Sequence, residues 1–417
     1  MQVFKFGGAS VKDADGVKNV LNVIRLFDKQ KLVVVVSAMG KTTNALEQIT
    51  KTFFTDKQYP QQAVQQLKNF HFKIADELFK NKDNEIYTDL QNVFVELDWM
   101  VEGEPESTYN YTYDQIVSVG EVLSTKIVAA YLKQEGVDVC WQDARDLIHT
   151  DNNYRDANVD WELTTQRTNQ LVNSIANNVI VTQGFIGTTS ENFTTTLGRE
   201  GSDYTAAIIA YAINAESVTI WKDVPGVLNA DPKYFPDAVL LDQISYQDAI
   251  ELAYYGASVI HPKTIKPLQN KNIPLWVKSF VSPENKGTII SLQQSAQKIP
   301  SYIFKTNQVL LSISPKDFSF VAEKSLSSIF TIFAKHGVKI NLMQNSAISF
   351  SVCFDEVENR LEKVIEDLKA NFKVLYNQGV ELVTIRYYNQ QTIDKIIRNK
   401  PILLEQKSRN TVQLVLK

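Results

Sequence analysis

Short runs of apolar residues alternate, along the first part of the chain, with longer segments in which apolar residues recur at helical spacing. The runs typical of buried strands lie at 2–6, 32–37, 137–141, 179–183, 217–222 and 274–277. Helical spacing is clearest at 17–27, 116–131 and 248–255, and the region 51–102 is helical in period without clear strands. This alternation predicts a mostly parallel sheet between layers of helices, with one inserted helical excursion.

The pattern changes at 292–301, where Gln, Ser, Lys and Pro replace the apolar rhythm. Beyond it we expect a strand at 309–313, followed by a helix with Leu326 and Phe333 on one face. Two strands follow at 338–342 and 348–354, then a helix carrying Val357 to Leu368 and a last strand at 372–376. This order is that of a ferredoxin-like unit. Further strands at 380–386, 402–405 and 412–416, with a short helix at 392–398, indicate a second, shortened unit. The predicted domains are 1–292, 302–378 and 379–417.

Composition restricts the function classes. With 417 residues the chain is too long for one compact core. The 43 basic and 47 acidic side chains give a net charge of -4, so neither nucleic acid nor a membrane is an expected partner. Cys140 and Cys353 lie far apart, and the four histidines do not cluster, so we expect no disulfide and no resident metal. Lacking a signal-type segment and any run of about 18 apolar residues, the chain is expected to be cytoplasmic.

The segment 196–205 concentrates chemistry on one short turn. It carries Arg199, Ser202 and Asp203 between glycines, directly before the apolar run 206–213. A turn into a helix presents free backbone N–H groups at the positive end of the helix dipole, which suits an anion. The guanidinium of Arg199 can bind a carboxylate or phosphate through two hydrogen bonds. The alternative interpretation is an ordinary loop with a Ser or Asp helix cap.

Turns at the ends of other predicted strands support a ligand site. Lys5 is followed by Gly7 and Gly8, the second strand ends at Ser37 before the polar segment 38–44, and a third ends at Lys222. Parallel sheets bind ligands at the carboxyl ends of their strands, so these turns reinforce one another. The first is not a Walker A loop, because its lysine precedes the glycines. A simple strand-turn-helix connection is the alternative for each turn taken alone.

Six motifs, in order, carry a resemblance to the aspartate kinases: KFGGAS at 5–10, SVGEVLSTK at 118–126, VTQGFIG at 181–187, TTTLGREGSDYTAA at 194–207, WKDVPGVLNADPK at 221–233 and YGASVIHPKT at 255–264. The rear region resembles the ACT regulatory domains of that family. The resemblance implies an amino-acid kinase fold followed by ferredoxin-like ACT domains. It also implies transfer of the γ-phosphoryl group of MgATP to the side-chain carboxylate of L-aspartate. The product, 4-phospho-L-aspartate, leads to lysine, threonine, methionine and diaminopimelate.

The same resemblance implies roles for individual residues. Lys5 and Asp203 would be catalytic, with Lys5 at the transferring phosphoryl group and Asp203 orienting Lys5 or serving the metal-phosphate assembly. In the aspartate site, Arg199 would bind the α-carboxylate and Glu121 the ammonium. The full set for aspartate would be Thr43, Glu121, Arg199 and Ser202. The nucleotide-binding set would be Lys5, Phe6, Gly7, Gly8, Ser37, Lys222, Asp223 and Lys233.

Glu121 and His261 also have structural interpretations. Glu121 lies at a predicted helix start, where a carboxylate is favourable for the dipole in any protein. His261 precedes Pro262 at another predicted helix start, and we interpret it as a structural residue rather than a catalytic acid or base.

The chain departs from the family pattern at several positions. Ala9 stands where Thr is frequent and Ser258 where Lys is frequent; Lys41, Lys222 or Lys263 could supply the lost charge. Glu200 replaces a common glycine and is expected to point outward. In lysine-inhibited relatives an aspartate stands at the position of Asn341. Because an amide pairs less strongly with an ammonium, we expect little inhibition by lysine.

The remaining expectations concern assembly and alternative functions. Paired ACT domains predict a homodimer, with an amino acid as a possible effector. A related N-acetylglutamate or glutamate kinase shares the fold, but it does not account for an ammonium site at Glu121 together with an ACT tail. A non-catalytic amino-acid sensor does not require Lys5, Arg199 and Asp203 together. A nicotinamide-dependent oxidoreductase is not favoured, because no GxGxxG follows the first strand.

Overall fold

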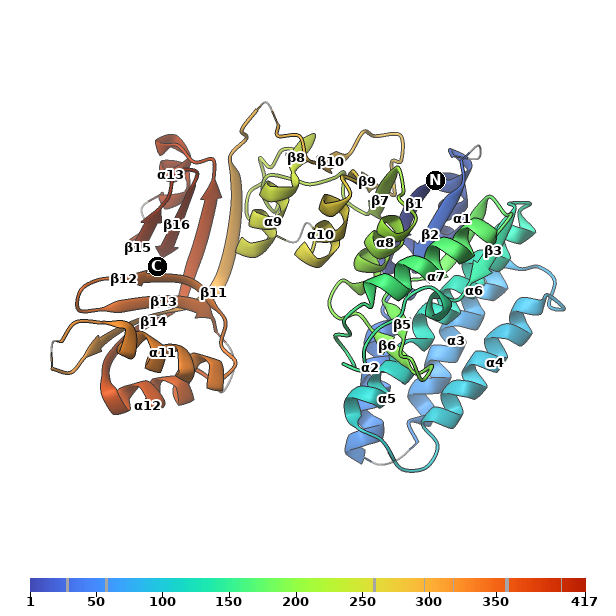
Figure 1. The fold of residues 1–417 in the computed structure, drawn as a ribbon, viewed down its shortest axis with the longest axis horizontal. Coiled ribbons are helices and arrows are strands. Elements are labelled where there is room, and N and C mark those ends of the chain that lie inside the picture. The colour runs from blue at the N-terminus through green and yellow to red at the C-terminus, as the bar shows by residue number, and fades with distance from the viewer. Residues whose placement is uncertain are drawn as a thin grey trace. The chain divides into compact units, whose positions relative to one another are not determined.

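The computed structural model describes residues 1–27, 30–56, 59–257, 260–295, 297–317, 319–356, 360–398 and 400–417. It divides into two compact units, each described by itself below (Figure 1). The first unit comprises Met1–Val227, Asp242–Ile250 and Ile260–Gln294, and the second comprises Leu228–Leu241, Glu251–Val259 and Ser295–Lys417. The second unit thus includes two stretches that precede the predicted break at 292–301.

The first unit is built on a mostly parallel sheet, as the sequence predicts. Its strands follow the spatial order β3 (Val139–Gln142), β4 (Val179–Gln183), β2 (Leu32–Val36), β1 (Gln2–Phe6), β7 (Ser217–Lys222), β9 (Leu275–Ser279), β10 (Thr288–Ser291) and β8 (Gln243–Ser245). Only the β9–β10 pair is antiparallel among these neighbours. Every residue of β2 is buried, as expected for a parallel strand covered on both faces.

Four short strands were not predicted from the sequence. They are β8 and β10 in the main sheet and the antiparallel pair β5 (Ile186–Thr188) and β6 (Thr194–Thr196). Three or four residues are too few to display a period, so no pattern distinguishes them from loops.

Helices and short 3-10 turns complete the first unit. Those between the strands are η1 (Gly8–Val11), α1 (Ala14–Arg25), α6 (Val119–Gln134), η2 (Ala144–Asp146), α7 (Trp161–Ser174), α8 (Gly201–Ala212) and α10 (Pro262–Asn270). Helix α9 (Tyr246–Tyr255) begins in the first unit, and its residues from Glu251 onward belong to the second. The predicted excursion is helical and comprises α2 (Thr42–Asp56), α3 (Gln61–Leu78), α4 (Glu85–Met100) and α5 (Tyr109–Val117). One apolar core joins these helices to the sheet, with Phe4 and Val34 from strands and Leu46, Leu90 and Ile127 from helices.

The stretch Tyr109–Gln134, which forms α5 and α6, is long and apolar enough to cross a membrane by length and composition alone. However, 78% of its apolar window is buried inside the fold. Its apolar residues are therefore accounted for by the core.

The second unit contains a six-stranded antiparallel sheet. Its order is β12 (Ile340–Asn345), β13 (Phe350–Asp355), β11 (Ser301–Pro315), β14 (Phe372–Arg386), β16 (Thr411–Leu416) and β15 (Ile402–Lys407). The helices α11 (Glu323–Lys335) and α12 (Leu361–Asn371) pack on one part of the sheet, and α13 (Gln390–Ile397) belongs to a second apolar cluster with Val383 and Val412. The predicted helix position Val357 lies outside the described residues.

The two strands predicted at 372–376 and 380–386 are one continuous strand, β14. In its pairing with β11, Arg386 lies opposite Ser301 at one end and Phe372 lies opposite Pro315 at the other. The register shifts between Lys305 and Leu310 of β11. This irregularity explains the split prediction, because a bulge interrupts the alternation of inward and outward side chains without ending the strand.

Candidate active site

The carboxyl ends of β1, β2 and β7 meet at a cavity of about 710 Å³ in the first unit. Helix α8 begins at the same cavity, so its free backbone N–H groups and dipole favour a bound anion there. Eight residues predicted from the sequence line this cavity: Lys5, Ser37, Thr43, Glu121, Arg199, Ser202, Asp203 and Lys222. Residues from widely separated parts of the sequence therefore form one site.

Asp203 lies between two lysines. Its Oδ1 is 2.6 Å from Lys5 Nζ and its Oδ2 is 4.0 Å from Lys222 Nζ. Neighbouring parallel strands β1 and β7 supply the two lysines, and the first turn of α8 supplies the buried carboxylate. The three side chains together carry a net positive charge at the cavity wall, which suits a polyanionic ligand.

The turn before α8 has a specific local structure. Glu200, the residue before the helix, adopts a left-handed conformation with φ of 54°. Its Oε2 accepts a hydrogen bond from the backbone N–H of His261 at 3.0 Å. The expectation that Glu200 points outward is therefore incomplete, since it anchors the turn to the start of α10 and also lines the cavity. His261 caps α10 by accepting from the N–H of Lys263, in agreement with its predicted structural role.

A glycine allows Ser202 to reach its place. A Cβ on Gly184, just beyond β4, would lie 2.4 Å from the Ser202 Cβ, so no larger residue fits there without displacing the start of α8. The motif 181–187 thus acts on the site through close packing.

Glu121 lies in the first turn of α6 and is almost fully buried. Its Oε1 accepts from the backbone N–H of Ala38 at 3.3 Å, and its Oε2 has no hydrogen-bond partner among the described residues. Burial raises the pKa of this carboxyl to about 8. A buried carboxylate oxygen without a partner beside a cavity favours a cationic ligand group.

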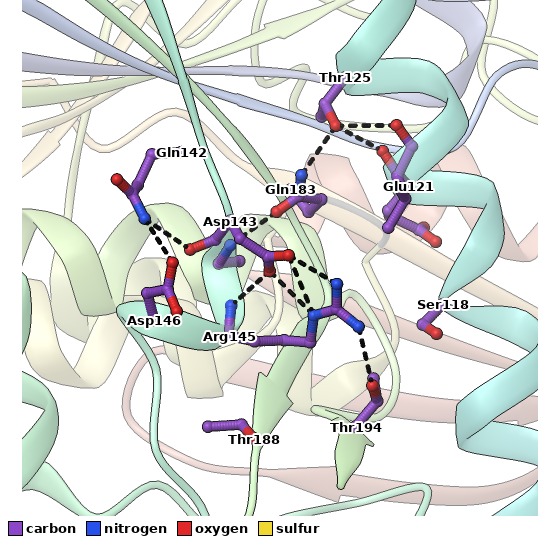
Figure 2. Close-up of polar contacts among 12 residues, drawn as sticks. Ser118, Glu121, Thr125, Gln142, Asp143, Arg145, Asp146, Gln183, Thr188 and Thr194 are labelled. Atoms are coloured by element: carbon purple, nitrogen blue, oxygen red, sulfur yellow. Dashed lines mark hydrogen bonds and ion pairs between the residues drawn. The ribbon is translucent and has the colours of Figure 1, made fainter. Parts of the chain in front are cut away.

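Hydrogen bonds hold the first turns of α6 against the end of β4 (Figure 2). The Thr125 hydroxyl donates to the backbone oxygen of Glu121 at 2.8 Å and accepts from the Gln183 side-chain amide at 2.9 Å. The Gln183 Oε1 in turn accepts from the backbone N–H of Ala144 at 2.6 Å. Because Thr125 and Gln183 are fully buried, this network restricts movement of the Glu121 backbone.

Comparisons with known proteins agree with this geometry. Residues 1–279 match the model of the amino acid kinase family. The chain is 31% identical over 406 residues to aspartokinase 2, chloroplastic, of Arabidopsis thaliana, covering 91% of this chain and 73% of that one. The chain belongs to the aspartokinases, within the amino acid kinase family.

Further relatives of this aspartokinase come from Escherichia coli. Lysine-sensitive aspartokinase 3 of strain K12 is 29% identical over 392 residues, which are 92% of this chain and 86% of that one. The crystal structure of E. coli aspartokinase III with aspartate and ADP, in the R-state, has a TM-score of 0.81 at 26% identity and covers 100% of this chain and 96% of that chain. The T-state structure with lysine and aspartate gives 0.84 at 26% identity, with 100% and 95% covered. The predicted fold and the predicted aspartate kinase activity are both confirmed.

The remaining predicted nucleotide residues of the aspartokinase lie outside the cavity lining or in the other unit. The Phe6 side chain is buried and stacks on Trp221, so only its backbone is available to a ligand. Gly7 and Gly8 follow β1, and Asp223 follows β7 with its side chain exposed. Lys233 belongs to the second unit, and Ser258 lies outside the described residues.

Gly8 is required by a close approach between two turns. A Cβ at this position would lie 2.6 Å from the carbonyl oxygen of Ala38, and the Gly8 carbonyl accepts from the N–H of Gly40 at 3.0 Å. The turns after β1 and β2 are thereby joined at the cavity's edge.

Several lining residues of the aspartokinase were missed by the sequence analysis: Glu47, Asn110, Tyr113, Arg155 and Phe185. Glu47 is one helical turn after Thr43 and could have been found from that spacing. Phe185 lies within the motif 181–187, although no role was predicted for it. Asn110 and Tyr113 come from α5 and Arg155 from a loop, and their approach to the sheet is tertiary, so no local pattern signals them.

Proposed function

We propose that the cavity binds L-aspartate and MgATP together, and that the enzyme transfers the γ-phosphoryl group to the aspartate side-chain carboxylate. The observation that carries this proposal is a pair of ionisable side chains on one cavity, neither of which has an ion-pair partner within the described residues. Glu121 offers a buried carboxylate oxygen, and Arg199 forms no ion pair within the described part of the chain. An α-amino acid needs both a cationic and an anionic partner.

Aspartate would be held through its α-carbon groups. Arg199 would bind the α-carboxylate, Glu121 the ammonium, and the hydroxyls of Thr43 and Ser202 would add hydrogen bonds. This arrangement leaves the side-chain carboxylate free to face Lys5 and the phosphates. A carboxylate is already a nucleophile at neutral pH, so the site needs positioning and charge stabilisation rather than a strong base.

The nucleotide would lie on the lysine side of the cavity. Lys5 would contact the transferring group, with the backbone amides of Phe6, Gly7 and Gly8 and the Ser37 hydroxyl near phosphate oxygens. Lys222 and Asp223 would complete this side. Asp203 would orient Lys5, a role supported by their 2.6 Å ion pair. Charge that develops on the phosphoryl oxygens would then meet a preplaced ammonium.

Mg²⁺ would enter with the nucleotide. Within the described ranges no group of three or more His, Cys, Asp or Glu side chains could hold a metal. Asp203 supplies one carboxylate, and Mg²⁺ commonly takes one or two carboxylates plus substrate phosphates. When bound, the ion neutralises phosphate charge and orients the phosphates.

Regulation and assembly form the second part of the proposal. We infer a cytoplasmic homodimer through the ACT region that serves lysine, threonine, methionine and diaminopimelate synthesis, with an amino acid as a possible effector. Inhibition by lysine should be small, because Asn341 is already engaged. Its Oδ1 accepts from Lys305 Nζ and its Nδ2 donates to Gln308 Oε1, each at 2.8 Å.

The test is formation of the acyl phosphate, trapped as a hydroxamate with MgATP. We expect product with L-aspartate and little with glutamate or N-acetylglutamate. The variants Lys5→Ala and Asp203→Ala should lose turnover, and Lys266→Ala, an exposed lysine of α10, is the control. No product with aspartate would refute the assignment, and full turnover in either variant would refute its catalytic role.

A further inference from the structure

Arg155 is a second arginine on the active-site cavity, from a loop that the sequence motifs do not include. It adopts a φ of 75°, in the left-handed region that residues other than glycine rarely occupy. Such conformations are strained and concentrate at functional sites, where the surrounding structure enforces them.

A buried carboxylate fixes the Arg155 backbone. Asp114, fully buried on α5, accepts from the backbone N–H of Arg155 at 3.0 Å. The same carboxylate accepts from the backbone N–H of Thr196 at 2.9 Å and from its hydroxyl at 2.7 Å. Thr196 ends β6, three residues before Arg199. One carboxylate therefore ties Arg155 to the strand that delivers the predicted substrate arginine.

The side chain of Arg155 is oriented but not neutralised. Its guanidinium carbon lies 4.5 Å from the ring centroid of Tyr113 and 5.7 Å from that of Tyr109. The Tyr113 hydroxyl donates to Glu47 Oε1 at 2.5 Å, so the tyrosine itself is held. Across the described residues, no carboxylate forms an ion pair with Arg155. A guanidinium held against aromatic rings without an ion-pair partner can still donate its N–H groups to a planar anion.

The position of Arg155 identifies the anion. Its backbone oxygen is 3.3 Å from the point where a Cβ on Gly198 would lie, which places it beside the residue preceding Arg199. Arg155 contacts Tyr109, Tyr113 and Asp114, and Asp114 also binds Thr196, whereas Lys5 pairs with Asp203. Arg155 thus lies with the carboxylate-binding arginine rather than with the phosphate-facing lysines.

We propose that Arg155 binds the α-carboxylate of aspartate together with Arg199, and that Asp114 is the positioning residue that places both arginines. This inference rests on the proposed function of the cavity. Two guanidinium groups on the α-carboxylate would favour substrates that keep this group ionised. They would also hold the reactive side-chain carboxylate toward Lys5.

The test compares aspartate with its α-amide, which lacks the α-carboxylate, in Arg155→Gly and Arg155→Lys. Glycine accepts the φ of 75° without strain, so the first variant removes the side chain and retains the loop. We expect the KM for aspartate to rise about 10-fold in Arg155→Gly, with kcat and the KM for ATP within about twofold of the wild type. The preference for aspartate over the α-amide should fall by a similar factor, and Arg155→Lys should be intermediate.

Arg25→Met, which removes an exposed guanidinium from α1, is the control and should change none of these values. Aspartate binding is also measured as a thermal shift without nucleotide, and melting curves check folding. A wild type that binds aspartate but forms no hydroxamate would contradict the proposed function alone. If Arg155→Gly folds and keeps the full preference for aspartate over the α-amide, Arg155 does not bind the α-carboxylate. An increase confined to the KM for ATP would likewise assign it to the nucleotide and overturn the inference.

Discussion

Glu121 makes aspartate binding depend on pH. In the free enzyme, burial raises the pKa of Glu121 to about 8, so most molecules carry the neutral acid at pH 7. The proposed contact with the aspartate ammonium requires the carboxylate. Binding should therefore expel the proton, and aspartate affinity should improve as pH rises.

The size of the effect follows from the pKa. At pH 7 about one molecule in eleven carries the ionised group, and at pH 8 about half do, so the aspartate dissociation constant should fall about fivefold between these values. About 0.9 proton should be released per aspartate bound at pH 7. The change should level off above pH 9, where Glu121 is ionised before the substrate arrives.

Two measurements test this prediction. Titration calorimetry in buffers of different ionisation enthalpy gives the proton count, and kcat/KM for aspartate at saturating MgATP gives the pKa of the enzyme–MgATP complex before aspartate binds. Glu121→Gln, of similar shape but without a charge to gain, should lose the pH dependence and bind aspartate on the order of 100-fold more weakly at pH 8. A flat affinity from pH 6.5 to 8.5 with no proton release would refute the reasoning.

The same group predicts the pH dependence of stability. Its folded pKa is raised above the ordinary value of 4.5, so its stabilising contribution is complete below pH 4.5 and is lost as pH rises through about 8. The melting temperature of the aspartate-free enzyme should therefore fall between about pH 4.5 and pH 8, and this fall should be smaller in Glu121→Gln and be offset by aspartate. A decline of equal size in the wild type and the variant would assign it to other groups.

Three other predictions use contacts described above. Asp203→Asn should lower kcat on the order of 100-fold while the aspartate-induced thermal shift remains, because the lysines lose their orienting charge; an unchanged kcat would contradict this. Gly8→Ala should lower the free energy of unfolding by about 1–3 kcal/mol and raise the KM for ATP, because the new Cβ collides with the Ala38 carbonyl. An unchanged midpoint in chemical denaturation would contradict this prediction. Added lysine should lower the turnover of the wild type less than about twofold, and it should lower that of Lys305→Met more, because this variant releases Asn341. Strong inhibition of the wild type in the hydroxamate assay would refute this prediction.

The sequence predicts those parts of the site that lie on continuous motifs. Lys5 and Arg199 stand in short segments whose glycines and strand-end positions carry a recognisable physical signal, and the sheet brings them together as parallel topology requires. Glu121 was identified by resemblance, but its raised pKa could not be predicted, since it depends on burial by groups distant in the sequence. Arg155 had no signal at all, because its conformation depends on the buried Asp114 rather than on its own neighbours.

At the turn before α8, the local sequence and the tertiary contacts determine different features of the site. The sequence indicates an anion-binding helix start, whereas the contact of Glu200 with His261 joins segments 61 residues apart. In the second unit, alternation predicts the strands well. It fails where the bulge in the β11–β14 pair interrupts the period of two.

The pairing of the two 15-residue strands β11 and β14 has a consequence for truncated forms of the enzyme. A chain ending at residue 378 would stop within β14, leaving the first half of β11 without its partner on that side and removing β16 and β15. An unpaired strand of this kind is a site for association between molecules. Shortening the enzyme at this point is therefore expected to cause aggregation, and the segment after 378 must be retained even if its only contribution is to complete the sheet.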